Sequence, residues 1–329
     1  MEATTEEELI ETIREVDAQG RQLLFVGGGS NILASDEPFD GVVLRDARSK
    51  IVLTQEGGCE GANLRVLGGT DWDELVVHTI ENEWMGLEAL SGIPGTVGAA
   101  PVQNIGAYGQ EVASSVARVR VWDRQKNRSH EFALSDLKFG YRTSILKESL
   151  NEGWGPSPRY IVLYVDFQLR IASLSAPVQY AQLAKTLGVE PGKRVPAVDV
   201  RAAVLDLRRS KGMVLDDSDR DTYSCGSFFT NPVLTPEQAD RLPEGAPRFP
   251  ADGGLVKTSA AWLIQHAGFG RGFGDGSAGL STKHALALTN RGGATASDLV
   301  ALARTVRDGV AERFGVVLVP EVNLVGLSL

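Results

Sequence analysis

Helical and strand patterns of apolar residues cover most of the chain, with the strands in clusters. Thr5 to Gln19 carries an apolar stripe, with a Thr5–Glu8 capping box at its start and Gly20 at its end, so we predict a helix there. Further helices are predicted from Asp71 and over 179–187, 199–210, 260–267 and 297–314, and strands over 23–26, 42–44, 51–53, 64–67, 117–122, 160–169, 285–290 and 316–319. Because strands cluster without steady β–α–β alternation, we predict an α+β fold with mixed sheets.

The stretch from Gly86 to Gly109 breaks this pattern. It is apolar, small and rich in glycine, without a clear period. Such a segment is too unpatterned for one helix and too apolar for a solvent loop, so a bound ligand is expected beside it. Glycine is frequent overall, with 37 in 329 residues, which fits either close approach to a ligand or many tight turns.

Composition excludes several classes of protein. At 329 residues, with 43% hydrophobic and 23% charged residues, we expect two or three globular domains. The net charge of −9 argues against a nucleic-acid or anionic-membrane partner, and no apolar run reaches the roughly 18 residues of a membrane span. The acidic N-terminal residues do not look like a secretory signal, and two cysteines, Cys59 and Cys225, make no disulfide framework. We therefore expect a cytoplasmic protein.

The glycine run GGGSN at 27–31 follows a predicted strand. A Rossmann fingerprint would need a further glycine where this chain has Ile32, so NAD binding of that type is not expected. Two interpretations stay open. Successive backbone N–H groups could form a nest for an anion such as a pyrophosphate, or the run could be a tight turn.

Other candidate residues are ambiguous when taken one at a time. Ser227 in CGSFF, Tyr141 and Arg142 in FGYR, and Glu321 after Pro320 could each belong to a site, a buried strand or a salt bridge. The histidines at 78, 130, 266 and 284 lack metal-ligand spacing. We expect them to be surface or packing residues, and we expect no metal.

Taken in order, however, the motifs resemble one family. They are GGGSN (27–31), SGIPGTVGAAPVQNIGAYGQEV (91–112), FGYRTSILK (139–147), GSFFTNPV (226–233), AAWLIQHAGFGRG (260–272) and VPEVNLVG (319–326). This order and content closely resemble the UDP-N-acetylenolpyruvoylglucosamine reductase (MurB) family over nearly the whole chain. The segment around Tyr180 resembles the type I branch.

The resemblance implies a PCMH-type FAD-binding fold of two domains plus a third, substrate-binding α+β domain. We expect FAD-binding subdomains at 1–49 and 50–205, and a substrate-binding domain with a C-terminal catalytic strand at 206–329. It also implies that NADPH reduces FAD, which then reduces UDP-N-acetylglucosamine enolpyruvate to UDP-N-acetylmuramate for peptidoglycan synthesis. We expect a monomer.

The same resemblance implies roles for individual residues. Arg142 would stabilise the negative charge that develops on the substrate, Glu321 would help to hold the enolic carboxylate, and Ser227 would protonate the α-carbon. Substrate contacts are implied for Tyr141, Tyr180, Arg220 and Asn231. FAD contacts are implied for Gly27, Gly28, Gly29, Ser30, Asn31, Ile93, Gly95, Thr96, Gly98, Ala99, Asn104, Gly106, Ala107 and Tyr108.

The sequence departs from the family at its start. Family members carry a segment resembling TTLRVGGPA before the first helix, whereas this sequence begins at MEATTEEEL. We expect weaker flavin retention than in a chain extended upstream. Two alternatives to the reductase are an FAD-linked oxidase of the same superfamily and a non-catalytic sugar-nucleotide binder.

Overall fold

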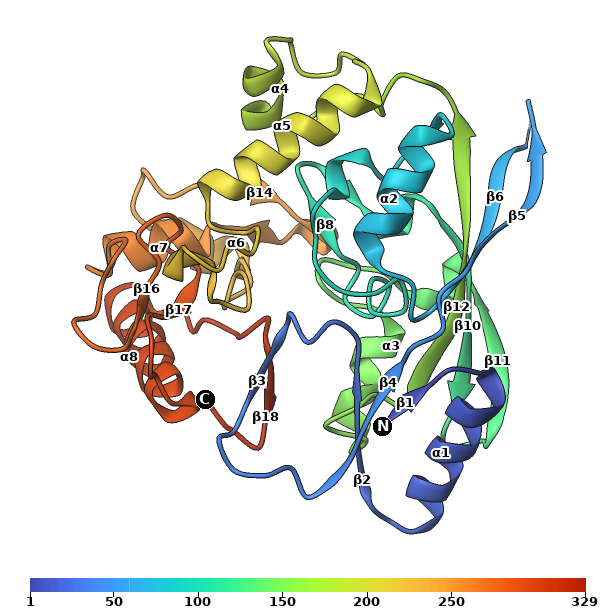
Figure 1. Ribbon diagram of the computed structural model, residues 1–329. Helices are drawn as coiled ribbons and strands as arrows, with labels where there is room; N and C mark the ends of the chain where they lie inside the picture. Colours follow the sequence, from blue (N-terminus) through green and yellow to red (C-terminus); the bar gives the residue numbers. More distant parts are fainter. Residues whose placement is uncertain (59) are drawn as a thin grey trace. The chain divides into compact units, whose positions relative to one another are not determined.

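The chain folds into two compact units, which a computed structural model describes for residues 1–58 and 60–329 (Figure 1). The first unit comprises Met1–Gly29 and Phe39–Leu207, and the second comprises Ser30–Pro38 and Arg208–Leu329. The family boundary expected at 205 and 206 stays a prediction, as does the division at 49. Cys59 lies outside the described residues.

The first unit begins with a small parallel sheet covered by a helix. Its strand order is β1-β4-β2, with β1 at Glu2–Ala3, β2 at Gln22–Val26 and β4 at Gly41–Asp46. Helix α1 (Glu6–Ala18) carries the predicted capping box and buries Leu9, Ile13 and Val16. The helix predicted from the N-terminal pattern is therefore confirmed.

A larger antiparallel sheet forms the centre of the first unit, in the order β11-β10-β12-β6-β5. Its strands are β5 (Ile51–Gly57), β6 (Gly61–Leu67), β10 (Val116–Asp123), β11 (Arg128–Ala133) and β12 (Tyr160–Ile171). The pairing of β12 with β10 shifts between Val162 and Tyr164, so Leu163 is an extra residue in β12. Such a bulge reverses the alternation of side chains. It places Val162 and Val165 in the same core although they are three residues apart.

Helices cover this sheet and extend the first unit. Figure 1 shows α2 (Trp72–Glu81) beside β6 and β12, where Trp72, Leu75 and Val76 enter the core. Helices α4 (Ala181–Leu187) and α5 (Ala197–Ser210) pack on each other through an apolar cluster of their own. The remaining elements here are β7 (Trp84–Met85), η1 (Glu88–Leu90), β8 (Gly106–Ala107), β9 (Gln110–Glu111), η2 (Val112–Ser114), η3 (Leu134–Leu137), α3 (Ile145–Glu148) and η4 (Ser149–Glu152).

The second unit is built around α8 (Ala296–Phe314), which starts at a Thr295–Asp298 capping box and ends at Gly315. Its buried face joins residues from β16 (Ala278–Leu280) and β17 (Leu288–Asn290). The other elements are β3 (Ile32–Ala34), η5 (Arg220–Thr222), β13 (Val233–Leu234), α6 (Pro236–Asp240), β14 (Phe249–Pro250), η6 (Asp252–Gly254), β15 (Val256–Lys257), α7 (Ala260–His266) and β18 (Asn323–Val325).

The C-terminal strand differs from the prediction. Residues 316–319 alternate between buried and exposed side chains, with Leu318 buried and Val319 60% exposed, but they form no regular strand. The strand lies instead at β18, which pairs in parallel with β3. The prediction over 316–319 is wrong because alternation reports which side chains are buried, whereas a ladder also needs a partner strand. Among the described residues, no helix is long and apolar enough to cross a membrane.

Candidate functional site

The glycine run after β2 meets the glycine-rich segment that begins at Gly92. A Cβ added at Gly28 would lie 3.0 Å from the Cα of Gly95, and one added at Gly27 would lie 2.8 Å from the Oγ1 of Thr96. Two backbone segments far apart in sequence therefore approach without side chains between them. This close packing is an arrangement that glycine permits, and the anion nest at 27–31 stays a prediction.

Backbone hydrogen bonds join the 95–98 segment to the end of β6. Gly98 N donates to the Gly68 carbonyl at 2.8 Å, Val97 N donates to the Thr70 carbonyl at 2.8 Å, and Trp72 N donates to the Gly95 carbonyl at 3.0 Å. A Cβ on Gly98 would lie 2.9 Å from the Gly68 oxygen. The central sheet thus fixes the position of the segment that faces Gly27 and Gly28. The predicted residues Ile93 and Ala99 flank this segment in the sequence.

A tight hairpin follows, formed by β8 and β9. Tyr108 (φ 48°) and Gly109 (φ 86°) are both left-handed, as the two central residues of a type I′ turn must be. Asn104, also left-handed at φ 47°, is buried. Its Nδ2 donates to Glu111 Oε2 at 2.9 Å and to the Gly140 carbonyl at 3.0 Å, and its Oδ1 accepts from Ala113 N at 3.1 Å. Asn104 therefore has a clear structural role, in addition to the FAD contact implied for it.

Arg142 lies against the loop that Asn104 organises. Its Nη2 donates to the Gly106 carbonyl at 2.7 Å and its Nη1 to the Asn104 carbonyl at 3.4 Å. The guanidinium carbon also lies 5.5 Å from the centre of the Tyr141 ring. The first unit therefore brings together four residues that the sequence predicted separately.

Tyr180 precedes α4 and packs against the hairpin. Its ring meets the Tyr108 ring edge to face, with centroids 5.6 Å apart. Tyr180 is 43% exposed, so part of the ring is available to a ligand. A residue implied to contact substrate and one implied to contact FAD are thus in direct contact.

In the second unit, Ser227 lies beside His284. The Ser227 hydroxyl and His284 Nε2 are 3.3 Å apart, within hydrogen-bond distance. Burial, together with the charges of Lys211 and Arg271, lowers the pKa of His284 to about 4. The imidazole is therefore neutral at neutral pH. Nothing in STKH (281–284) indicates that the His284 side chain reaches Ser227, and the sequence predicts only a surface or packing role for this histidine.

Glu321 lies on the segment next to Ser227. Its backbone N donates to the Phe228 carbonyl at 2.8 Å, and its carbonyl accepts from Asn31 Nδ2 at 3.2 Å. Asn31 leads into β3, and Asn323 N donates to its carbonyl at 3.0 Å. The second unit therefore places Ser227, Glu321 and Asn31 on neighbouring segments.

The other predicted residues of the second unit have local partners. Asn231 Oδ1 accepts from Ala260 N at 3.0 Å, at the start of α7. Arg220 in η5 lies over the Tyr223 ring, 4.5 Å from its centre. Ser30 is the first residue of the 30–38 segment.

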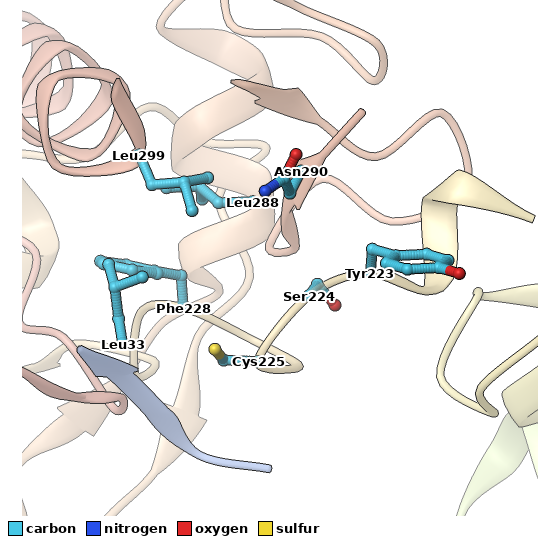
Figure 2. Close-up of a pocket in the computed structure, with 8 residues that line it drawn as sticks. All are labelled: Leu33, Tyr223, Ser224, Cys225, Phe228, Leu288, Asn290 and Leu299. Carbon is cyan, nitrogen blue, oxygen red and sulfur yellow. The ribbon is translucent and has the colours of Figure 1, made fainter. Parts of the chain in front are cut away.

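A separate cavity of about 260 Å³ lies in the second unit (Figure 2). Figure 2 shows the apolar side chains of Leu33, Phe228, Leu288 and Leu299 in its wall, with Cys225 near them. Burial raises the pKa of the Cys225 thiol, which donates to the Ile32 carbonyl. No predicted site residue lines this cavity, and its lining offers no Lys or Arg for a diphosphate.

The first unit fits an FAD. The close approach of Gly27 and Gly28 to the 95–96 segment leaves no room for a Cβ there. Backbone amides are the groups that hold a pyrophosphate at such a surface. Within residues 1–58 and 60–329, no group of three or more His, Cys, Asp or Glu side chains could hold a metal ion.

Comparison with known proteins agrees with this geometry. The family model described as UDP-N-acetylenolpyruvoylglucosamine reductase, C-terminal domain, matches residues 218–325, and that of an FAD binding domain matches residues 1–127. The chain is 51% identical to the UDP-N-acetylenolpyruvoylglucosamine reductase of Cutibacterium acnes, over 99% of this chain and 85% of the relative. It is 48% identical to that of Thermobifida fusca, over 98% of this chain and 91% of the relative.

A solved structure is also similar. It is the UDP-N-acetylenolpyruvylglucosamine reductase (MurB) from Thermus caldophilus, at 25% identity and a TM-score of 0.63. The match covers 98% of this chain and 91% of that one. The predicted α+β class and FAD-binding fold are therefore confirmed.

Proposed function

This chain belongs to the UDP-N-acetylenolpyruvoylglucosamine reductase family, and from that membership we propose that NADPH is its reductant and that Arg142, Ser227 and Glu321 carry the reduction. The chain is an FAD-dependent oxidoreductase of peptidoglycan precursor synthesis. It reduces the enolpyruvyl group of UDP-N-acetylglucosamine enolpyruvate to give UDP-N-acetylmuramate.

When bound, FAD supplies hydride transfer from the nicotinamide to the substrate. In the first unit, Gly27, Gly28 and the 95–99 segment would hold the cofactor through backbone groups. The hairpin carrying Ala107 and Tyr108 would present further contacts. Support comes from the close approach of the two glycine segments, since a side chain at Gly28 would collide with backbone.

Arg142 would bind the substrate carboxylate and balance the negative charge that develops there. A guanidinium suits this role because it stays charged and presents several donors in one plane. Its attachment to the Gly106 carbonyl fixes the group in advance, so little reorganisation is needed when charge develops.

Ser227 would give its hydroxyl proton to the α-carbon, and Glu321 would hold the enolic carboxylate. The observation that carries this assignment is the hydrogen bond from Glu321 N to the Phe228 carbonyl, which sets the two residues on adjacent segments of one unit. A general acid and an electrostatic partner need such fixed mutual geometry.

Four further residues would contact the substrate or the nicotinamide. Tyr180 would cover the diphosphate and donate its hydroxyl hydrogen to it, and Tyr141 would shape the site beside Arg142. Asn231 and Arg220 would contact the diphosphate or the nicotinamide. We also propose that the chain acts as a monomer in the cytoplasm, where NADPH and nucleotide sugars are available, with no nucleic-acid partner. Its net charge of −9 supports the last point.

The test separates the two halves of the reaction. The FAD-loaded protein is mixed anaerobically with NADPH, and then with the enolpyruvyl substrate, while the flavin absorbance is followed. We expect bleaching by NADPH and recovery only on addition of substrate. In D2O, the product should carry one solvent-derived deuterium at the α-carbon. Ser227→Ala should bleach normally but recover much more slowly.

Other outcomes would contradict the proposal in identifiable ways. Rapid recovery in air without substrate would favour the oxidase alternative. Tight binding of the UDP-sugar without any bleaching would favour a non-catalytic binder. Normal recovery in Ser227→Ala would leave NADPH in place as reductant and remove Ser227 as the proton donor.

A further inference from the structure

Ser227 has a chemical difficulty as a proton donor, and the residue next to it offers a solution. A serine hydroxyl is a weak acid, whereas efficient general acids have a pKa nearer the operating pH. A group that holds the hydroxyl in the correct orientation and stabilises the oxygen after proton loss would reduce this difficulty. His284 Nε2 lies 3.3 Å from the Ser227 hydroxyl oxygen.

We propose that His284 is a positioning residue for the reduction, and that its Nε2–H donates to the Ser227 oxygen. This inference rests on the proposed function, because it assumes that Ser227 protonates the substrate. The direction of the bond follows from the role. If the serine donated to the imidazole, its proton would be held in that bond and would not point toward the substrate. With Nε2 as the donor, the hydroxyl hydrogen stays available.

The loop that carries His284 is fixed on both sides. Ser281 is fully buried, and its hydroxyl accepts from His284 N at 3.2 Å and from Lys283 N at 3.0 Å. On the C-terminal side, Ala287 N donates to the His284 carbonyl at 3.1 Å. The backbone beneath the imidazole therefore has little freedom.

Two carboxylates of the neighbouring loop strengthen this arrangement. Asp221 accepts from Thr282 N at 2.8 Å and also from the Thr282 hydroxyl. Asp219 forms an ion pair with Lys283. Two acidic residues of the DDSDRD segment (216–221), Asp219 and Asp221, thus hold the turn that presents His284.

Burial and nearby positive charge keep the imidazole of His284 neutral. Burial is the largest cause of its lowered pKa, and Lys211 and Arg271 add positive charge nearby. At neutral pH His284 therefore offers one N–H donor and does not compete with Ser227 as a source of protons. Both carboxylates named above hydrogen-bond to the loop, at Thr282 and Lys283, rather than to the imidazole.

The protonation step balances. A C–H bond forms at the α-carbon as the O–H bond of Ser227 breaks, and the electron pair of that bond stays on the serine oxygen. The Nε2–H of His284 stabilises this oxygen by hydrogen bonding, without transfer of its own proton. Water then returns a proton to the oxygen. The hydride that reaches the other carbon comes from the cofactor of the proposed function.

The test compares two substitutions of similar size. His284→Gln keeps an amide N–H donor, whereas His284→Leu keeps bulk and loses the donor. Flavin reduction by NADPH and flavin reoxidation by substrate are measured separately in single-turnover experiments. We expect His284→Leu to slow reoxidation by about 10- to 100-fold. This lies at or below the effect of removing one oxyanion-hole donor, because His284 acts through Ser227. We expect His284→Gln to recover most of this loss. His130→Leu, at an exposed site, serves as the matched control.

A second measurement does not depend on activity. Long-range 1H–15N NMR of the wild-type protein reports which ring nitrogen of His284 carries hydrogen, and Ser227→Ala should shift the Nε2 signal. Hydrogen on Nδ1 alone would overturn the inference, even if His284→Leu failed to fold. Normal reoxidation in folded His284→Leu, with slow reoxidation in Ser227→Ala, would overturn the inference and leave the proposed function standing. Normal reoxidation in Ser227→Ala would overturn both the inference and the role proposed for Ser227, and would leave NADPH in place as reductant.

Discussion

Arg142 donates from Nη2 to the Gly106 carbonyl at 2.7 Å, so the loop that carries Asn104 and Gly106 holds the guanidinium directly. Arg142 also has a left-handed backbone, with φ at 57°. A left-handed conformation costs about 1 kcal/mol for a residue with a Cβ. Residues in such conformations concentrate at functional sites, where surrounding structure offsets their cost. Lys147 contributes here by donating from Nζ to the Arg142 carbonyl at 3.3 Å.

Arg142→Lys should lower kcat/KM for the enolpyruvyl substrate by about 100- to 1,000-fold. Lysine keeps the charge and the backbone strain, but it cannot hold the Gly106 carbonyl and a carboxylate in one plane. Flavin reduction by NADPH should be unchanged. Stopped-flow absorbance measures both steps. Arg45→Lys, at a half-exposed ion pair with Glu2, is the control, and an equal effect there would contradict the prediction.

Gly28→Ala should weaken FAD binding. The new Cβ would lie 3.0 Å from the Cα of Gly95, and backbone cannot rotate away. Overpacking of this kind costs about 1–3 kcal/mol. If the two segments move apart to relieve this contact and FAD binding must bring them back together, the whole cost falls on binding and the Kd for FAD rises by roughly 5- to 150-fold.

Two glycine variants control for this change. At Gly27 the obstructing atom is the Thr96 hydroxyl oxygen, a side-chain atom that can rotate, so Gly27→Ala should have a smaller effect. At Gly276 nothing lies within 4 Å of an added Cβ, so Gly276→Ala should leave FAD affinity unchanged. Isothermal titration of FAD into each apoprotein gives the three values. Equal FAD affinities in all three variants would contradict the prediction that the contact between Gly28 and Gly95 controls FAD binding.

The free energy of unfolding should decrease as the pH is lowered, because of His284. Its pKa is about 4 in the folded chain, against 6.5 for an unperturbed histidine, so the unfolded chain binds more protons between these values. The contribution is present above pH 6.5 and is lost as pH falls toward 4, by on the order of 3 kcal/mol. His284→Gln removes this contribution. Urea unfolding of both proteins at about pH 7 and about pH 4.5 isolates it, and identical pH dependence would contradict the shift.

Tyr180→Phe tests the contact proposed for the substrate diphosphate. The ring remains, so the edge-to-face packing on Tyr108 and the melting temperature should not change. Loss of a hydrogen bond to a charged group costs about 1.5–3 kcal/mol, so KM for the substrate should rise roughly 10- to 150-fold. Steady-state kinetics and thermal unfolding measure both. An unchanged KM would mean that the hydroxyl does not contact the substrate.

Local sequence patterns predicted most helices and strands. They could not predict pairings between segments that are far apart in the sequence. The capping box at Thr5–Glu8 and the terminal glycine at Gly315 mark helix ends that the structure confirms. These signals act within a few residues of each other. By contrast, β3 is three residues long, and its pairing with β18 depends on a segment about 290 positions away. No local pattern identifies such a partner.

The candidate site shows the same limit. Motif resemblance pointed to Arg142 and Ser227 because both stand in distinctive strings. His284 stands in no such string, and only the fold brings its ring to within 3.3 Å of Ser227. The left-handed backbone of Tyr108 could not be predicted from the sequence either, although the glycine that follows it is a partial signal for the turn.

The membership of Ser30–Pro38 in the second unit has a consequence for how the protein is synthesised. Leu33 lies in the core of that unit together with Leu318 and Val322, and β3 pairs with β18. Residues emerging early from the ribosome must therefore wait for residues near the end of this sequence. Closing so long a loop is entropically unfavourable and slow. We expect the second unit to complete its core only after residues 316–325 have been synthesised, and a 208–329 fragment to expose the edge of β18 that β3 covers.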